Sequence, residues 1–243
     1  MNATESAAAG PMPTATGAPK PGARRVVDAP TRALHWLMAF SFFGAFLTAE
    51  SDGWRQVHVT LGYTLAGLLA ARLLWGLFGP RPARLGSLGR RLQGLPAWLK
   101  SAATGRIDGR QGQNLALAAT VALLLAGIAP LVASGLGAYL EWPGGEGLEE
   151  LHEFLGNGML LLVLAHVGTV LALSLLRRRN LVAPMVTGRA AGAGPDLVRR
   201  PFGGVATLLL AAVLAFWAWQ WQTAPAVDAA AHAAQSRHHD DDD

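Results

Sequence analysis

The chain has 243 residues, of which 51% are hydrophobic and only 15% are charged, and its formal net charge is +4. This balance is typical of an integral membrane protein and argues against a soluble domain. The absence of cysteine excludes a disulfide, a thioether-linked c-type haem and an iron–sulfur cluster held by thiolates.

Residues 1–24 are rich in alanine, proline, glycine and threonine and contain few bulky apolar side chains. They lack the hydrophobic stretch that a signal peptide needs. A segment of this composition cannot bury enough apolar surface to fold, so we expect a disordered arm.

Five apolar stretches follow, each long enough to cross about 30 Å of hydrocarbon as a helix. They are residues 33–49, 57–78, 115–136, 151–176 and 204–221. The sequence therefore predicts an all-α membrane protein in which residues 25–188 form a domain with four transmembrane helices. Residues 189–203 are a linker, residues 204–221 a fifth, C-terminal transmembrane helix, and residues 222–243 an acidic tail.

The loop at residues 80–113, between the second and third stretches, contains leucines at helical spacing among its arginines. These leucines are Leu85, Leu88, Leu92, Leu95 and Leu99. The pattern predicts a basic amphipathic segment on the inner membrane surface, interrupted at Pro96. A solvated basic linker is the alternative interpretation.

Basic residues gather in the N-terminal arm, in the loop at residues 80–113 and in the segment after the fourth stretch. The alternate loops and the C-terminal tail hold most of the acidic residues. The positive-inside rule therefore predicts a cytoplasmic N-terminus, a cytoplasmic linker and a periplasmic C-terminus. Positive charge on the inner face attracts anionic lipid headgroups and does not indicate nucleic acid.

Four of the seven histidines, His35, His58, His152 and His166, lie in or at the edge of the apolar stretches. An ionisable side chain at such a depth is costly, so each is a candidate functional residue. His152 and His166 share one predicted helix, in which they lie about 21 Å apart along the axis and within roughly 40° of one face. They cannot bind the same metal ion.

The helical rise pairs the histidines by depth. Counted from the outer loops, His35 and His166 both lie about 22 to 24 Å deep, whereas His58 and His152 both lie near the outer boundary. This predicts two bis-histidine sites, His35 with His166 toward the cytoplasm and His58 with His152 toward the periplasm.

Two imidazoles that face each other across an open space are the axial ligands of a b-type haem. Zinc or a di-iron centre would gather three or four ligands, usually with carboxylates, but only Glu153 accompanies a histidine inside a helix. The sequence therefore predicts two non-covalent haem b groups, with the four histidines as iron ligands. Taken singly, each histidine is equally well explained as an interfacial or packing residue.

Two arginines are candidates for contact with haem propionates. Arg72 reaches the depth of the inner site on about the same helix face as His58, and snorkelling to the inner interface is the alternative. Arg32 precedes His35 by one helical turn and also contributes to the positive-inside bias.

Several segments together resemble a known family. They are DAPTRALHW at residues 28–36, His58 followed by LGY at 61–63 and RLLWG at 72–76, His152-Glu153 with His166, and NLV at 180–182 with MVTG at 185–188. The chain resembles the bacterial cytochrome b561 and nickel-hydrogenase cytochrome b family over about residues 25–188.

The resemblance implies a four-helix haem-binding bundle in the bacterial inner membrane, with the four histidines as axial ligands in the pairing above. It also implies electron transfer between the quinone pool and a redox partner of the respiratory chain. Family members often have Gly-His-Asn-Pro before the third helix, where this chain has Gly112-Gln113-Asn114-Leu115. That histidine is not expected to be a ligand, so haem binding does not depend on it.

Three functional hypotheses fit these residues. The first is an electron-transfer protein or oxidoreductase subunit that docks a periplasmic cytochrome or a dehydrogenase such as hydrogenase. The second is an autonomous superoxide:quinone oxidoreductase, and the third a haem-free scaffold or transporter. The acidic outer loops repel a small anion and attract a basic cytochrome, which favours the first.

Other polar residues have no motif that assigns them a role. Tyr63, Tyr139, Glu153 and Ser134 are candidates for a quinone site. The tail at residues 238–243, two histidines followed by four aspartates, is interpreted as a disordered acidic segment, with weak cation binding as the alternative.

Overall fold

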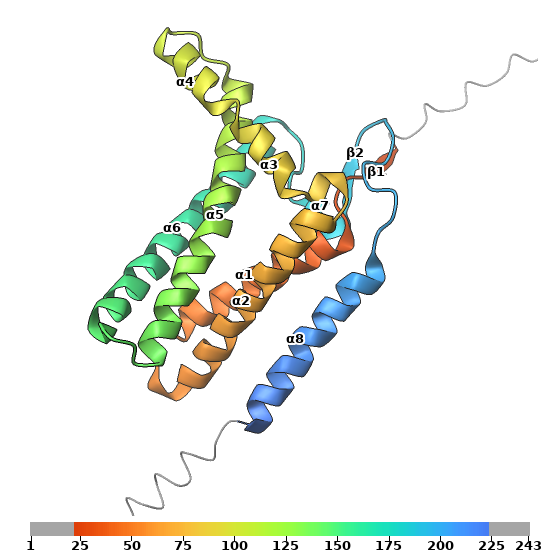
Figure 1. The fold of residues 1–243 in the computed structure, drawn as a ribbon. Coiled ribbons are helices and arrows are strands. Elements are labelled where there is room, and N and C mark those ends of the chain that lie inside the picture. The colour runs from red at the N-terminus through yellow and green to blue at the C-terminus, as the bar shows by residue number, and fades with distance from the viewer. Residues whose placement is uncertain (1–21, 224–243) are drawn as a thin grey trace, which may run out of the picture.

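The computed structural model describes residues 22–223 and is mostly helical (Figure 1). Most of the predicted N-terminal arm and of the acidic tail lies outside these residues. The elements in chain order are β1 (Ala23–Arg25), α1 (Ala29–Leu47), η1 (Asp52–Trp54), α2 (Arg55–Phe78), η2 (Arg81–Ala83), α3 (Leu85–Leu92), α4 (Leu95–Ala103), α5 (Gly109–Tyr139), α6 (Gly145–Leu176), α7 (Ala183–Thr187), β2 (Arg189–Ala191) and α8 (Gly203–Thr223).

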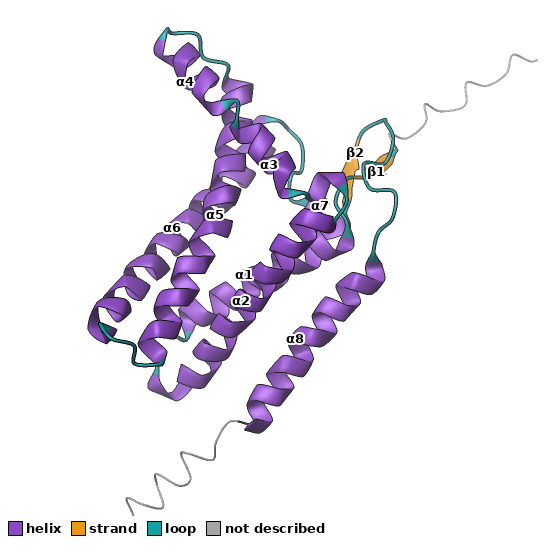
Figure 2. Cartoon of the chain, in the orientation of Figure 1, coloured by secondary structure: helices purple, strands orange, loops and turns teal. Residues whose placement is uncertain are grey.

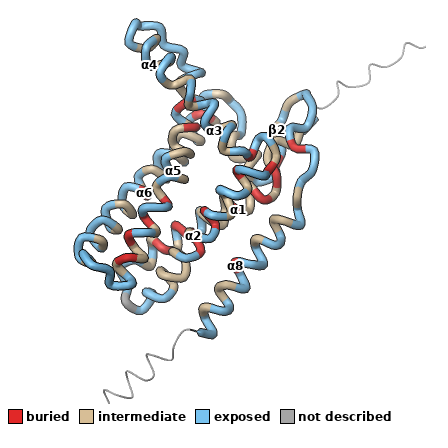
Figure 3. The backbone as a smooth tube through the Cα atoms, in the orientation of Figure 1, coloured by how far each residue is buried: buried red, intermediate tan, exposed pale blue. Residues whose placement is uncertain are grey.

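Four helices are long and apolar enough to cross a membrane, namely α2, α5, α6 and α8. Most of the surface of α8 and much of that of α6 is exposed (Figure 3), including Phe154, Leu175 and Leu208. So large an exposed apolar surface is unfavourable in water and is typical of helices in a lipid bilayer. In lipid, a helix satisfies the hydrogen bonds of its own backbone groups.

Helix α1 has 19 residues and is not among these four. Pro30, Arg32 and His35 lower the hydropathy of its first turns. It packs along α2 for much of its length. A five-span topology therefore stays a prediction.

The helices pair as α1 with α2 and α5 with α6, and α2 contacts α5. Apolar side chains from all four helices meet in one buried cluster. Its members are Phe42, Leu65, Leu69, Ile128, Leu131 and Met159. Interdigitated apolar packing of this kind excludes water from the middle of the bundle.

Helix α8 packs against α1 and α2 through a second buried cluster of Leu34, Leu68 and Val213. The Trp217 indole N–H donates a 2.9 Å hydrogen bond to the Thr64 hydroxyl in α2. A hydrogen bond between helices in an apolar surround fixes their relative position. Helix α8 is thus part of the packed structure.

The segments before α1 and after α6 are joined by backbone hydrogen bonds. Strands β1 and β2 pair antiparallel, with Arg24 opposite Ala190, and lie near α7 in Figure 2. The Val26 and Val27 N–H groups both donate to the Gly188 carbonyl. The Trp36 indole donates to the Met185 carbonyl at 3.0 Å. These contacts bring together two of the sequence segments that carry the family resemblance.

Asp28 caps the N-terminus of α1 and is 1% exposed. Its carboxylate accepts hydrogen bonds from the Thr31 N–H and hydroxyl at 2.8 and 2.9 Å, and from the Trp75 indole N–H at 2.9 Å. A cap of this kind satisfies N–H groups that have no partner within the helix. It also joins α1 to α2.

The loop at residues 80–113 forms two short helices, α3 and α4. The break falls at Gln93 and Gly94, and Pro96 lies in the first turn of α4, where its missing N–H costs nothing. Helix α3 packs on α2 and α5, and α4 packs on the start of α5, which begins at Gly109 because Asp108 caps it. Helices α3 and α4 therefore pack on the bundle itself, whereas the Leu99 side chain is 53% exposed.

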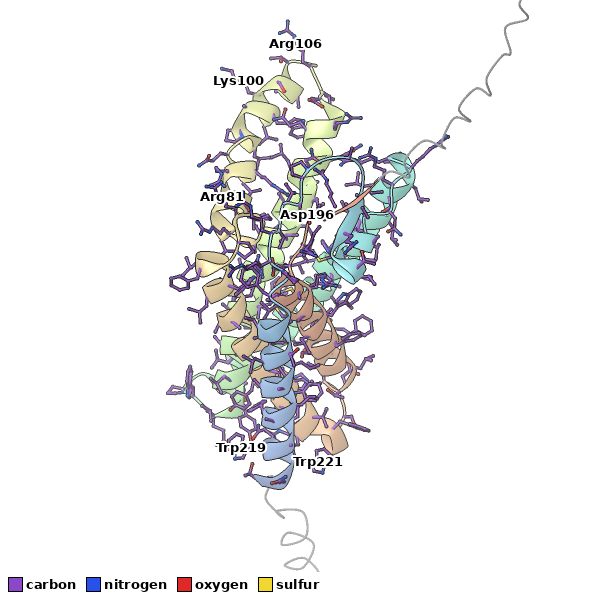
Figure 4. The ribbon with its side chains drawn as sticks, turned by 90° about the vertical axis from the view of Figure 1, so that its right-hand side faces the viewer. Arg81, Lys100, Arg106, Asp196, Trp219 and Trp221 are labelled. Carbon is purple, nitrogen blue, oxygen red and sulfur yellow. The ribbon has the colours of Figure 1, made fainter. Side chains whose placement is uncertain are left out.

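The bundle has two chemically different ends. Arg81, Lys100 and Arg106 lie toward one end in Figure 4, and Trp219 and Trp221 lie at the other. We call the first the arginine-rich end. The second, the acidic end, includes the exposed residues Glu50, Glu141, Glu146, Glu149 and Glu150.

Candidate functional site

The first histidine pair lies in the arginine-rich half of the bundle. His35 in α1 and His166 in α6 have ring centres 6.5 Å apart, with ring planes inclined by 52°. The Nδ1 atom of each is buried and has no hydrogen-bond partner within residues 22–223. A buried polar atom without a partner is costly, and coordination to a metal ion is one way to satisfy an imidazole nitrogen.

The second pair lies near the acidic end. His58 in α2 and His152 in α6 have ring centres 5.9 Å apart, with ring planes inclined by 86°. The His58 Nδ1 lies 2.8 Å from the Ala45 carbonyl, and the His152 Nδ1 lies 2.9 Å from the Leu131 carbonyl. Donation from Nδ1 to a carbonyl leaves the Nε2 lone pair free, as in histidine ligands of metals.

Both ring separations fit two axial ligands of one haem iron. Two metal–nitrogen bonds of about 2 Å, together with the distance from each nitrogen to its ring centre, place the ring centres about 6 Å apart. No three histidine, aspartate or glutamate side chains gather into a metal-binding group among residues 22–223. The donor set of each pair is two imidazoles, which is the set that b-type haem takes.

A cavity of about 740 Å³ is lined by both histidines of the acidic-end pair. This volume lies within the range of roughly 300–1,000 Å³ that small-molecule and cofactor sites occupy. Its wall includes Gly62, Gly135 and Gly156, which contribute no side chain. A flat macrocycle therefore finds space beside the histidines.

Gly135 in α5 is a site residue that sequence reasoning missed. A Cβ atom at this position would lie 2.6 Å from Cε1 of His152 and 2.8 Å from its Nδ1. Residue 135 must therefore lack a side chain for the His152 ring to reach the Leu131 carbonyl. The sequence around it, Ala133-Ser134-Gly135, contains no signal that distinguishes this contact from ordinary helix packing.

The predicted propionate contacts lie on α1 and α2. Arg72 has a buried Nη1 atom without a hydrogen-bond partner in the described residues, and the Asp28 carboxylate attracts its charge. Arg32 donates from Nη1 to the Val186 carbonyl at 2.7 Å, and its Nε is buried without a partner. Each guanidinium thus keeps at least one donor for a further acceptor.

The apolar cluster of the bundle lies between the two histidine pairs. Phe42 follows His35 by about two helical turns, Leu65 follows His58 by the same distance, and Met159 lies midway between the two histidines of α6. The six buried side chains of this cluster carry no titratable group.

The candidate quinone residues all lie near the acidic-end pair. Tyr63, Tyr139 and Glu153 line the cavity. Ser134 is buried, with its hydroxyl 3.3 Å from the His152 Nδ1 and 3.0 Å from the Leu131 carbonyl, to which it donates. Ser134 therefore belongs to the surroundings of the histidine.

A sequence model of the family described as prokaryotic cytochrome b561 matches residues 26–188, which include all four of these histidines. The chain belongs to this family. Comparisons with curated proteins and with solved structures gave no match.

Members of the cytochrome b561 family generally transfer electrons across a membrane and typically bind haem b. Together with the four candidate spans, family membership makes this chain a multi-pass protein of the prokaryotic inner membrane. The match ends at Gly188, so helix α8 lies beyond it.

This cytochrome b561 chain has Gln113 where family members often carry histidine. The Gln113 side-chain oxygen accepts hydrogen bonds from Nε and Nη2 of Arg177 at 3.1 and 2.9 Å, and Asn114 accepts a third at 3.0 Å. The position therefore serves to join the start of α5 to the end of α6.

Proposed function

We propose that the chain is a di-haem b-type cytochrome that transfers electrons between the quinone pool and a redox partner of the respiratory chain. His35 and His166 would hold the haem of the arginine-rich half, and His58 and His152 that of the acidic end. The single observation that carries this proposal is that each pair has the ring separation of two axial ligands.

Haem held by each histidine pair would supply one-electron redox chemistry. The Ala45 and Leu131 carbonyls hold the acidic-end imidazoles in one tautomer and raise their basicity as ligands. The cluster around Phe42 and Met159 keeps water out of the space between the pairs. Arg72, which the helical rise puts at the depth of the arginine-rich pair, would supply a positive charge for a propionate.

The proposed topology has five crossings, with α1 as the least apolar. By the positive-inside rule, the arginine-rich end would face the cytoplasm. One histidine pair would then lie toward the inner face of the bilayer and the other toward the outer face. The exposed glutamates of the acidic end would then face the periplasm. A negative surface steers a basic redox partner, such as a cytochrome or a dehydrogenase subunit, toward the outer haem.

The test is the haem content and redox titration of the purified full-length protein. We expect two haems per chain, the sharp visible bands of low-spin b haem, and reduction by a quinol. Protein that is folded but free of haem would overturn the proposal in favour of a scaffold or transporter. Fast reduction by superoxide, with weak salt dependence, would instead favour a superoxide:quinone oxidoreductase.

Substitution of Gly135 by alanine is expected to lower the haem content from two per chain toward one. The added methyl group would overlap the His152 ring and displace it from the Leu131 carbonyl. The matched control is Gly158→Ala in α6, because a Cβ there meets no atom within 4 Å. Equal haem content in both variants would contradict the role assigned to Gly135.

A further inference from the structure

The cavity at the acidic end has an uneven charge distribution. Its lining includes two histidines and two tyrosines. The other ionisable side chains that line it are Glu50, Arg55, Glu149 and Glu153. Three of these are carboxylates, which repel an anionic group, and Arg55 is the one cation among the described lining residues. An anionic substituent on a bound group is therefore most stable beside Arg55.

Arg55 is placed beside the acidic-end pair by the helix that carries His58. It is the first residue of α2, three residues before His58, so the two share a helix face one turn apart. Arg32 has the same spacing to His35 in α1. Both helices thus carry an Arg-x-x-His sequence, although the Arg32 guanidinium is already bonded to the Val186 carbonyl.

The Arg55 guanidinium lies over the ring of Tyr139, the last residue of α5, with its carbon 5.6 Å from the ring centre. A contact of this kind attracts the cation to the face of the aromatic ring. A guanidinium carries five N–H donors and can bind a carboxylate through two parallel hydrogen bonds. Tyr139 therefore positions Arg55.

We propose that Arg55, positioned by Tyr139, binds a propionate of the acidic-end haem and raises the midpoint potential of that haem. The proposal rests on the di-haem function proposed above. A cation beside the haem favours the reduced form, because reduction removes one positive charge from the iron centre. Arg55 is a cofactor-binding residue in this proposal, and Tyr139 is the residue that positions it.

The test uses the full-length haem-loaded protein and the variants Arg55→Gln, Arg55→Lys and Tyr139→Leu. The control is Arg106→Gln, which removes an equal charge from an exposed position at the opposite end. Two quantities are measured, the rate at which haem transfers to an apoprotein acceptor and the midpoint potentials of the two haems. The component that disappears in His58→Ala identifies the acidic-end haem.

For Arg55→Gln we expect about fivefold to tenfold faster loss of the acidic-end haem, a range set by the exposure of the side chain. Its midpoint potential should fall, while that of the other haem stays unchanged. Arg55→Lys and Tyr139→Leu should give intermediate values, and Arg106→Gln should match the wild type.

The outcomes separate this inference from the function on which it rests. Wild-type protein without haem would refute the di-haem function itself. Two haems in the wild type, with unchanged transfer rate and potentials in Arg55→Gln, would refute the role of Arg55 alone. If Arg55→Gln does not fold, the test uses Arg55→Lys and Tyr139→Leu. Wild-type transfer rates and midpoint potentials in both of these variants would also refute the role of Arg55.

Discussion

Replacement of His166 by alanine is expected to remove one of two haems and to leave the other in place. His166 faces His35, and their ring centres are 6.5 Å apart. The other two histidines make their own contacts with the Ala45 and Leu131 carbonyls. Loss of one axial ligand from the first pair therefore leaves the second pair intact.

His35→Ala is expected to give the same product, and the double variant should lose no more haem than either single variant. Two residues that hold one group are non-additive in this way. His58→Ala or His152→Ala should remove the other haem. The measurements are haem per chain and the number of components in a redox titration. Full haem content in any of the four single variants would contradict the pairing.

Replacement of Asp28 by alanine is expected to lower the free energy of unfolding by about 3 kcal/mol or more. The variant loses a helix cap, worth roughly 1 kcal/mol, and leaves the Trp75 indole N–H without its acceptor at a cost of about 1–3 kcal/mol. It also removes the carboxylate that attracts the Arg72 charge. We expect the melting temperature in detergent to fall by roughly 10 °C.

Two matched variants resolve these contributions. Thr31→Ala removes a single hydrogen bond to the Asp28 carboxylate and should cost about 1 kcal/mol. Asp28→Asn keeps an oxygen acceptor for the cap and for Trp75 but removes the negative charge, so its loss should lie between the other two. A melting temperature for Asp28→Ala within the error of the wild type would show that Trp75 and the start of α1 find other partners.

The helical class and the candidate histidines follow from hydropathy and spacing, whereas the helix ends do not. The length of an apolar stretch predicts only the part of a helix that lies in hydrocarbon. Helix α5 begins at Gly109, in a polar segment, because Asp108 accepts the Gln111 N–H. Pro96 likewise lies in the first turn of α4. The Asp108 cap and the position of Pro96 depend on local geometry that hydropathy does not describe.

The sequence predicts the depth of each histidine pair but not the surroundings of the rings. Depth along a helix follows from the rise per residue, so His35 matches His166 and His58 matches His152 by counting alone. The structure places the same rings 6.5 and 5.9 Å apart. The backbone carbonyls that the Nδ1 atoms of His58 and His152 meet depend on how neighbouring helices approach and rotate, which counting along one helix cannot predict.

The membrane class, the family resemblance and the four histidines follow from composition and from spacing within single helices. The contacts between segments that are distant in the chain depend on the packing of the helices. These include Gly135 against His152, Asp28 with Trp75, Arg55 over Tyr139, and Trp217 of α8 with Thr64. Each depends on how two helices approach and rotate against each other, which is a property of the packed core as a whole.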